Sequence, residues 1–414
     1  MLKCGFRNSS GEAMHLVFSD QPMPESVVKS IFLAGPSPRD VEVDDWRHAA
    51  LAILEELNFD GTVFLPVPSY RFKLNITDKD KAGWSYDNQI DWECEARKRA
   101  DIIVFWVPRT INRQRDDLGM PAFTTNFEFG EDLHSNRIEY GRPAEAPKNK
   151  YLDTRIRGIG QTAYDMLKPL FEAVMARLGA GALRTAGETC VPLFIWNSPA
   201  FQSWYANMRV AGNRLDDATV LSSFVVGGKF LLAYQLQVKI WVAAENRHKS
   251  NEFIFSRPDI SAVVACHKSK AGVKVALVRE FRSPVNNAQG YVFEMPGGSS
   301  TKPGMDPQVN ASHELAEETG LQVSDASRFV KVGQRQLVAT LSTHQAQVYG
   351  ILLSDAEFAQ LEASSKSQSA YGVAADTECT FVEIASVQEL FALPVDYATL
   401  GMVFEALQVL DIAG

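Results

Sequence analysis

The chain has 414 residues, more than one hydrophobic core usually holds, so we expect two or three domains. Its 46% hydrophobic and 22% charged residues are typical of a folded globular protein and argue against extensive disorder. The net charge of -9 argues against a broad basic surface for nucleic acid, although a few local groups can still hold a small anionic nucleotide.

The five cysteines lie far apart and form no C-x-x-C pair, which argues against a zinc site or a disulfide framework. The longest apolar runs have the length of strands, and the N-terminus lacks the pattern of an export signal. We therefore expect a cytoplasmic protein that does not enter the membrane.

Residues 30–135 alternate strands and helices. A buried strand at 30–36 ends in Gly-Pro and precedes an amphipathic helix, and a second strand follows at 62–68. A helix from about 88 to 99 then leads into the apolar run 101–108. This alternation predicts an α/β domain built on a doubly wound parallel sheet.

The pattern changes after this domain. Residues 141–150 are loop-like in composition, and a helix is expected over 159–178. The segment FQSWYANM predicts another helix, and residues 230–243 predict strands. We expect three parts with boundaries as follows: a first domain at 28–185, a connecting region with strands at 186–250, and a C-terminal domain at 251–414.

Two groups of residues in the first domain could form a site. Gly35 and Pro36 lie at the carboxyl end of a strand, where open α/β sheets bind ligands, although a plain tight turn is the simpler explanation. Downstream, the segment TTNFEFGEDL opens a helix with Glu128 in its first turn. Thr125-x-x-Glu128 also has the form of a capping box, in which the Glu bonds back to the helix start.

Taken together, the Ala-Gly-Pro strand, the acidic helix before the "AD" strand and the Glu before aromatic-Gly resemble the nucleoside 2-deoxyribosyltransferase-like family over about residues 30–180. The resemblance implies that Glu128 is the nucleophile and that Glu93 or Asp91 is the acid that protonates the leaving base. It also implies the following pocket residues besides Gly35 and Pro36: Tyr86, Arg109 and Asn126. An Arg-rich loop at 109–117 is either a phosphate-binding lid or a solvated loop.

The C-terminal half contains a strand, a Gly-rich loop and a helix expected over about 307–319, with Asp306 as its N-cap. Glu314, Glu317 and Glu318 are three and four residues apart, so they share one helix face. Hard divalent cations prefer such oxygen ligands. Alone, these glutamates would most simply be a solvated face.

The flanking EMPGG and ETGL segments make this region resemble the Nudix box, in the branch that hydrolyses ADP-ribose or nucleoside-diphosphate sugars. The resemblance implies a C-terminal α/β/α Nudix fold with a mixed sheet, and Mg²⁺ or Mn²⁺ bound by Glu314, Glu317 and Glu318. The sequence departs from the box in three places, of which the first is a loop one residue longer, counted from Gly298. Met305 stands where the loop Glu is expected, and His313 stands where an Arg is expected.

The same resemblance implies further site residues. Glu294 would be another metal ligand, Arg279 and Arg282 would contact phosphates, and Glu378 in a late loop would act as a base alongside Glu317 and Glu318. The alternatives are that the two arginines are exposed strand residues and that Glu378 is a solvated loop acid. The resemblance also implies a homodimer formed through the strands that precede the box.

Two functions follow. The first is a bifunctional nucleotide-metabolising enzyme that joins N-glycosidic chemistry to metal-dependent cleavage of pyrophosphate bonds, with a small nucleotide as substrate. The second is a nucleotide sensor that binds without turnover, which Met305 and His313 favour. A nucleic-acid-binding function has little support, because the basic cluster at 246–251 is short.

Overall fold

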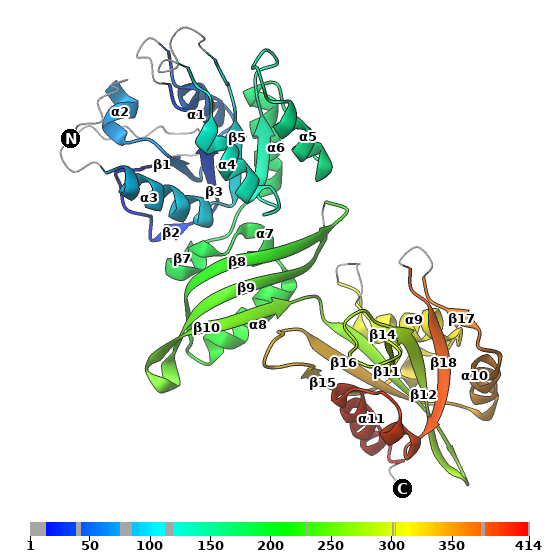
Figure 1. Cartoon of the computed structure of the whole chain (residues 1–414). Helices are drawn as coiled ribbons and strands as arrows, with labels where there is room; N and C mark the ends of the chain where they lie inside the picture. The colour runs from blue at the N-terminus through cyan, green and yellow to red at the C-terminus, as the bar shows by residue number, and fades with distance from the viewer. Residues whose placement is uncertain are drawn as a thin grey trace. The chain divides into compact units, whose positions relative to one another are not determined.

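The chain divides into two compact units, Met1–Phe255 and Ser256–Gly414 (Figure 1). The computed structural model describes the following residues: 14–38, 43–74, 85–111, 119–228, 230–299, 302, 304–373 and 377–412. Within these residues, no helix combines the length and the apolar character that crossing a membrane requires.

A five-stranded sheet in the order β1-β4-β3-β5-β6 forms the centre of the first unit. All of its strand pairs are parallel, as the sequence predicts. Its strands are β1 (His15–Phe18), β3 (Ser30–Ala34), β4 (Thr62–Leu65), β5 (Ile102–Trp106) and β6 (Ile138–Gly141). The connecting helices are α1 (Trp46–Glu56), α2 (Ser69–Leu74), α3 (Tyr86–Arg99), α4 (Phe123–Asp132), α5 (Lys150–Gly158) and α6 (Leu167–Leu178).

Helices cover both faces of this sheet. Alternate strand residues point to opposite faces, so Ile31 and Leu33 pack with α1 and α6, whereas Phe32 packs with α3, α4 and α5. The prediction of a doubly wound sheet is therefore confirmed. The order β4-β3-β5 places successive connections on either side of β3, and open sheets of this kind bind ligands at such a point, beyond the carboxyl ends of the strands.

The prediction of a helix over residues 159–178 is wrong for its first part, where the structure has no helix. The structure has α5, which ends at Gly158, and α6, which begins at Leu167. Gly160 has a positive φ of 79°, and the Tyr164 amide donates to Tyr140 O at 3.0 Å. The intervening residues therefore lie beside β6 instead of continuing a helix.

The remainder of the first unit contains a second, antiparallel sheet of three long strands, packed on one face by α8 through Phe201 and Tyr205. Its elements are β2 (Ser26–Val27), β7 (Arg184–Thr185), η1 (Ala186–Cys190), α7 (Leu193–Trp196), α8 (Pro199–Val210), β8 (Arg214–Val226), β9 (Phe230–Val242), η2 (Ala243–Glu245) and β10 (Arg247–Ser256). Lys98 forms an ion pair with Asp217 at 2.6 Å, so β8 is held directly against α3.

The second unit is built on a mixed sheet with β15-β16-β11-β12-β18-β17 as its main path. Only β11 and β16 pair in parallel among the pairs described. The strands are β11 (Ile260–Ser269), β12 (Gly272–Phe281), β13 (Tyr291–Glu294), β14 (Gly297–Gly298), β15 (Val330–Gln336), β16 (Gln345–Leu352), β17 (Ala370–Tyr371) and β18 (Thr380–Ser386). The helices are α9 (Pro307–Thr319), η3 (Ala326–Arg328), α10 (Asp355–Ser367), η5 (Glu389–Ala392) and α11 (Tyr397–Val409).

Helices lie on both faces of the mixed sheet. Ala311 and Leu315 of α9 pack with residues of α10 and with Val263, whereas Val403 of α11 packs on the other face with Val264. The predicted ends of α9 are confirmed. The Asp306 side chain accepts from the amides of Gln308 and Val309, and Gly320 follows the helix with a φ of 73°.

Candidate functional site

Two carboxylates, Glu128 of α4 and Glu93 of α3, define the candidate site of the first unit. Glu128 is only 9% exposed, and its pKa is raised to about 7 by burial and by the charge of Glu93. Burial also raises the pKa of Glu93, although its Oε1 accepts from Gln89 Nε2 at 2.8 Å, which partly stabilises the charged form. The negative charge of Glu93 therefore favours the protonated form of Glu128.

Two buried arginines place positive charge near this pair and lower the pKa of both carboxylates. Neither arginine was predicted as a site residue. Arg97 of α3 lies 4.0 Å from Glu128 and contacts Asp132 at 2.7 Å. Arg47 of α1 is fully buried and lowers the pKa of both Glu93 and Glu128. The "ARKR" run and the Trp-Arg start of the first helix contain these residues, but only the tertiary structure turns them inward.

Gly35 and Pro36 form the carboxyl end of β3 beside this pair. The Gly35 carbonyl accepts from Arg47 Nη2 at 2.6 Å, and the Pro36 carbonyl accepts from the Trp46 indole at 3.2 Å. A Cβ at position 35 would lie 2.2 Å from the Trp106 carbonyl. This close approach requires glycine at position 35. The two carbonyls hold the Arg47 and Trp46 side chains beside the end of β3.

The capping-box interpretation of Glu128 is wrong. The N-cap of α4 is Ala122, and no side chain caps this helix start. Thr125 is a buried residue inside the helix, so Glu128 lies in its second turn. Its carboxylate is therefore not used to satisfy the helix end.

The other residues predicted for this site are not all close to Glu128 and Glu93 in exposure or contacts. Asp91 and Tyr86 are exposed residues of α3, and Glu93 is the more enclosed of the two candidate acids. Arg109, which follows β5, donates through Nη2 to Asn126 Oδ1 at 2.6 Å. Most of the Arg-rich loop, residues 112–117, lies outside the described residues.

In the second unit, Glu314 and Glu318 of α9 face the Gly297-Gly298 segment. Glu318 is 2% exposed, and its carboxylate accepts from the Gly297 amide at 3.0 Å. A Cβ at position 298 would lie 2.8 Å from a Glu314 oxygen. The pKa of Glu314 is raised to about 7 by burial and by neighbouring carboxylates, and that of Glu318 is raised well above its usual value by burial.

More acidic residues surround these two. Glu294 accepts from Arg282 Nε at 2.9 Å, and Arg282 also contacts Glu280 at 2.8 Å. The charges of Glu294 and Glu378 both raise the pKa of Glu318. Within the described ranges, however, no three acidic, His or Cys side chains already form a group that could hold a metal ion.

Arg279 and Glu317 are separate from this acidic cluster. Arg279 alternates with Glu280 and Arg282 along β12, so it points to the other face of the strand, where it donates to Glu383 at 3.0 Å. Glu317 is exposed on α9, although its charge still raises the pKa of Glu314. His313 is also exposed, and Met305 is half-buried.

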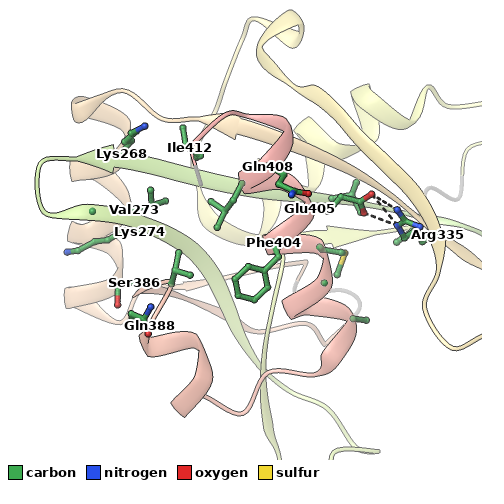
Figure 2. Close-up of a pocket in the computed structure, with 18 of the residues that line it drawn as sticks. Lys268, Val273, Lys274, Arg335, Ser386, Gln388, Phe404, Glu405, Gln408 and Ile412 are labelled. Atoms are coloured by element: carbon green, nitrogen blue, oxygen red, sulfur yellow. Dashed lines mark hydrogen bonds and ion pairs between the residues drawn. The ribbon is translucent and has the colours of Figure 1, made fainter. Parts of the chain in front are cut away.

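A cavity of about 1000 Å³ lies elsewhere in this unit. Its lining includes Met402, Glu405 and Gln408 of α11 together with sheet residues such as Val273 (Figure 2). Glu405 forms an ion pair with Arg335 at 2.7 Å at its side. Because α11 and α9 pack on opposite faces of the sheet, this cavity does not contain the acidic cluster.

The first unit thus has a doubly wound parallel fold with two neighbouring carboxylates, the buried Glu128 and the half-buried Glu93. Residues 28–131 match the family model described as nucleoside 2-deoxyribosyltransferase like. The match confirms the predicted N-terminal domain of this kind. No curated protein matches the chain.

Proposed function

We propose that this protein is a bifunctional nucleotide-metabolising enzyme that cleaves an N-glycosidic bond in its first unit and a pyrophosphate bond in its second. The observation that carries the first activity is the buried Glu128, which has a pKa of about 7 and lies beside Glu93 within the matched domain. Release of a free base from nucleosides or nucleotides, followed by chromatography, tests this activity. A lack of any base release would contradict it.

In the first activity, the ionised Glu128 attacks the anomeric carbon of the sugar, and the bond from that carbon to the base nitrogen breaks. Glu93 donates a proton to the departing base. Water or another base then displaces Glu128. Attack by a carboxylate is favoured because the transition state carries positive charge on the sugar. The developing positive charge on the sugar favours the ionised form of Glu128.

In the second activity, Glu314 and Glu318 would hold Mg²⁺ or Mn²⁺, with Glu294 or Glu317 as a further ligand. Their carboxylate oxygens suit a hard cation, and their pKa values are raised first by burial and then by the negative charges of neighbouring carboxylates. Such a metal would lower the pKa of an attacking water and neutralise the pyrophosphate. Glu378 is our candidate base, and Arg282 our candidate phosphate contact.

The alternative is that the second unit binds a nucleotide without turnover. Met305 favours this function, because a thioether is a poor ligand for a hard cation. Tight nucleotide binding without any product, unchanged by Glu314→Gln and Glu317→Gln, would support the sensor and exclude the hydrolase.

Glu314→Gln is expected to stabilise the metal-free protein at pH 8. The folded-state pKa of Glu314, about 7, lies above its ordinary value of 4.5. The protonated carboxyl therefore stabilises the fold below pH 4.5, and this contribution is lost as the pH rises through 7. Glutamine mimics the protonated form, so we expect a gain on the order of 1–2 kcal/mol in the free energy of unfolding at pH 8.

Thermal unfolding of both proteins with EDTA and with Mg²⁺ measures this effect. Mg²⁺ should raise the Tm of the wild type more than that of Glu314→Gln. Equal Tm values in EDTA at pH 8, together with equal responses to Mg²⁺, would show that Glu314 neither carries uncompensated charge nor binds the cation.

We also propose that the protein forms a homodimer through the sheet of β8, β9 and β10. Large apolar side chains on these strands are exposed, namely Leu221, Phe224, Val226, Leu232 and Phe253. Surfaces of this kind mark interaction sites. Phe224→Glu should convert a dimer into a monomer in sedimentation experiments, whereas Val210→Glu, at an exposed position on α8, should not. A monomeric wild type would exclude the dimer.

A further inference from the structure

A pocket of about 490 Å³ lies at the carboxyl ends of β5 and β6 in the first unit. Trp46, Pro108, Met120 and Pro143 supply apolar walls, and Arg109 supplies a cation. The volume is within the range of small-molecule sites, which are mostly apolar with a few polar groups that fix the ligand. The function proposed above assigns no ligand group to this pocket.

Arg109 is a buried cation that contacts no buried anion among the residues that the structure describes. The residue is only 8% exposed, and its hydrogen bonds go to two neutral acceptors, Lys148 O at 3.2 Å and Asn126 Oδ1 at 2.6 Å. Its Nε has no hydrogen-bond partner within the described part of the chain. Burial lowers its pKa, and no carboxylate among the described residues offsets this effect. Buried charges are normally paired, whereas the described part of the chain supplies no counter-ion to this guanidinium.

The acidic residues of the pocket do not fill this role. Asp44 and Glu145 line it, but both are exposed to water. Arg142, which follows β6, provides a contrast, because its Nη2 contacts Asp153 at 2.9 Å. An anion supplied by a ligand in this pocket would pair with the Arg109 guanidinium.

We propose that Arg109 binds the phosphate of a nucleoside 5′-monophosphate, so that the first unit acts on nucleotides in preference to nucleosides. This inference rests on the proposed glycosidic activity and names its substrate class. Asn126, which accepts from Arg109, is two residues before Glu128 on α4. The residue that positions Arg109 and the attacking carboxylate therefore lie on the same helix. A planar guanidinium suits two phosphate oxygens at once.

Binding measurements that do not depend on turnover test this proposal. Calorimetry with Glu128→Gln as the background would compare AMP and CMP with adenosine and cytidine, and would use inorganic phosphate as a probe independent of the base. The same ligands would be tested with Arg109→Met and Arg109→Lys added. Arg155→Gln is the matched control, because it removes an exposed arginine of α5 in the same unit.

We expect each monophosphate to bind at least tenfold more tightly than its nucleoside, and Arg109→Met to remove that difference. Arg109→Lys should retain part of it, and Arg155→Gln should change nothing. Equal affinities for nucleotide and nucleoside in the Glu128→Gln protein would overturn the proposal whatever the folding of the Arg109 variants. Phosphate binding without base release by the wild type would reject the glycosidic function and leave the phosphate subsite intact.

Discussion

Glu128→Gln should lower base release by on the order of 10³-fold while the fold is retained, because the amide cannot attack the sugar. Glutamine keeps the volume of the side chain and removes a carboxyl whose pKa is already raised to about 7 by burial. The substitution should therefore leave the Tm unchanged or raise it. Circular dichroism and base release, measured on the same preparation, separate a chemical effect from an unfolding effect.

The pH dependence of the wild type provides a second readout. Since attack needs the ionised Glu128, kcat/KM for base release should fall as the pH drops below about 7. Asp87→Asn, which removes an exposed carboxylate from the first turn of α3, is the matched control and should retain most activity. A flat profile between pH 6 and 8, or a Glu128→Gln protein with wild-type rates, would show that another group attacks the sugar.

Glu318→Gln should lower metal-dependent pyrophosphate cleavage by on the order of 10²-fold or more, since removal of a single preorganised electrostatic group has this effect in other enzymes. Glu318 is nearly fully buried and is fixed by the Gly297 amide at 3.0 Å. Its position is therefore more tightly defined than that of the exposed Glu317. Titration of activity with Mg²⁺ should also show a weaker apparent affinity for the metal.

Glu362→Gln of α10 is the control for this variant, because it removes a carboxylate from the same unit that pairs with Lys274 at 3.4 Å. It should leave the Mg²⁺ titration unchanged. If Glu318→Gln and Glu362→Gln hydrolyse nucleoside-diphosphate substrates equally fast, the acidic cluster on α9 is not the site of metal-dependent cleavage.

The sequence predicts those parts of the fold that depend on local signals. Asp306, Pro307 and Gly320 determine the ends of α9, and the strand-helix alternation over residues 30–135 predicts the parallel sheet. The spacing of Glu314 and Glu318 places them on one face, and the structure shows them together against Gly297 and Gly298.

The parts that could not be predicted depend on residues distant in sequence. Arg47 and Arg97 lie beside Glu93 and Glu128 only because α1, α3 and α4 meet at the edge of the sheet. Thr125 and Glu128 have the spacing of a capping box, but α4 begins two residues earlier, at Phe123, so this spacing falls inside the helix. Arg279 and Arg282 were predicted to contact phosphates together, but Arg279 contacts Glu383 and Arg282 contacts Glu294.

The central claim is that one chain carries two separate nucleotide reactions. Mass spectrometry of products from nucleoside monophosphates and nucleoside-diphosphate compounds with Mg²⁺, using wild type, Glu128→Gln and Glu318→Gln, tests it most directly. We predict that the wild type yields both free base and pyrophosphate cleavage products, and that each variant loses only one of these activities. Two results would contradict the account. One is a single variant that loses both activities, and the other is that both variants keep both activities.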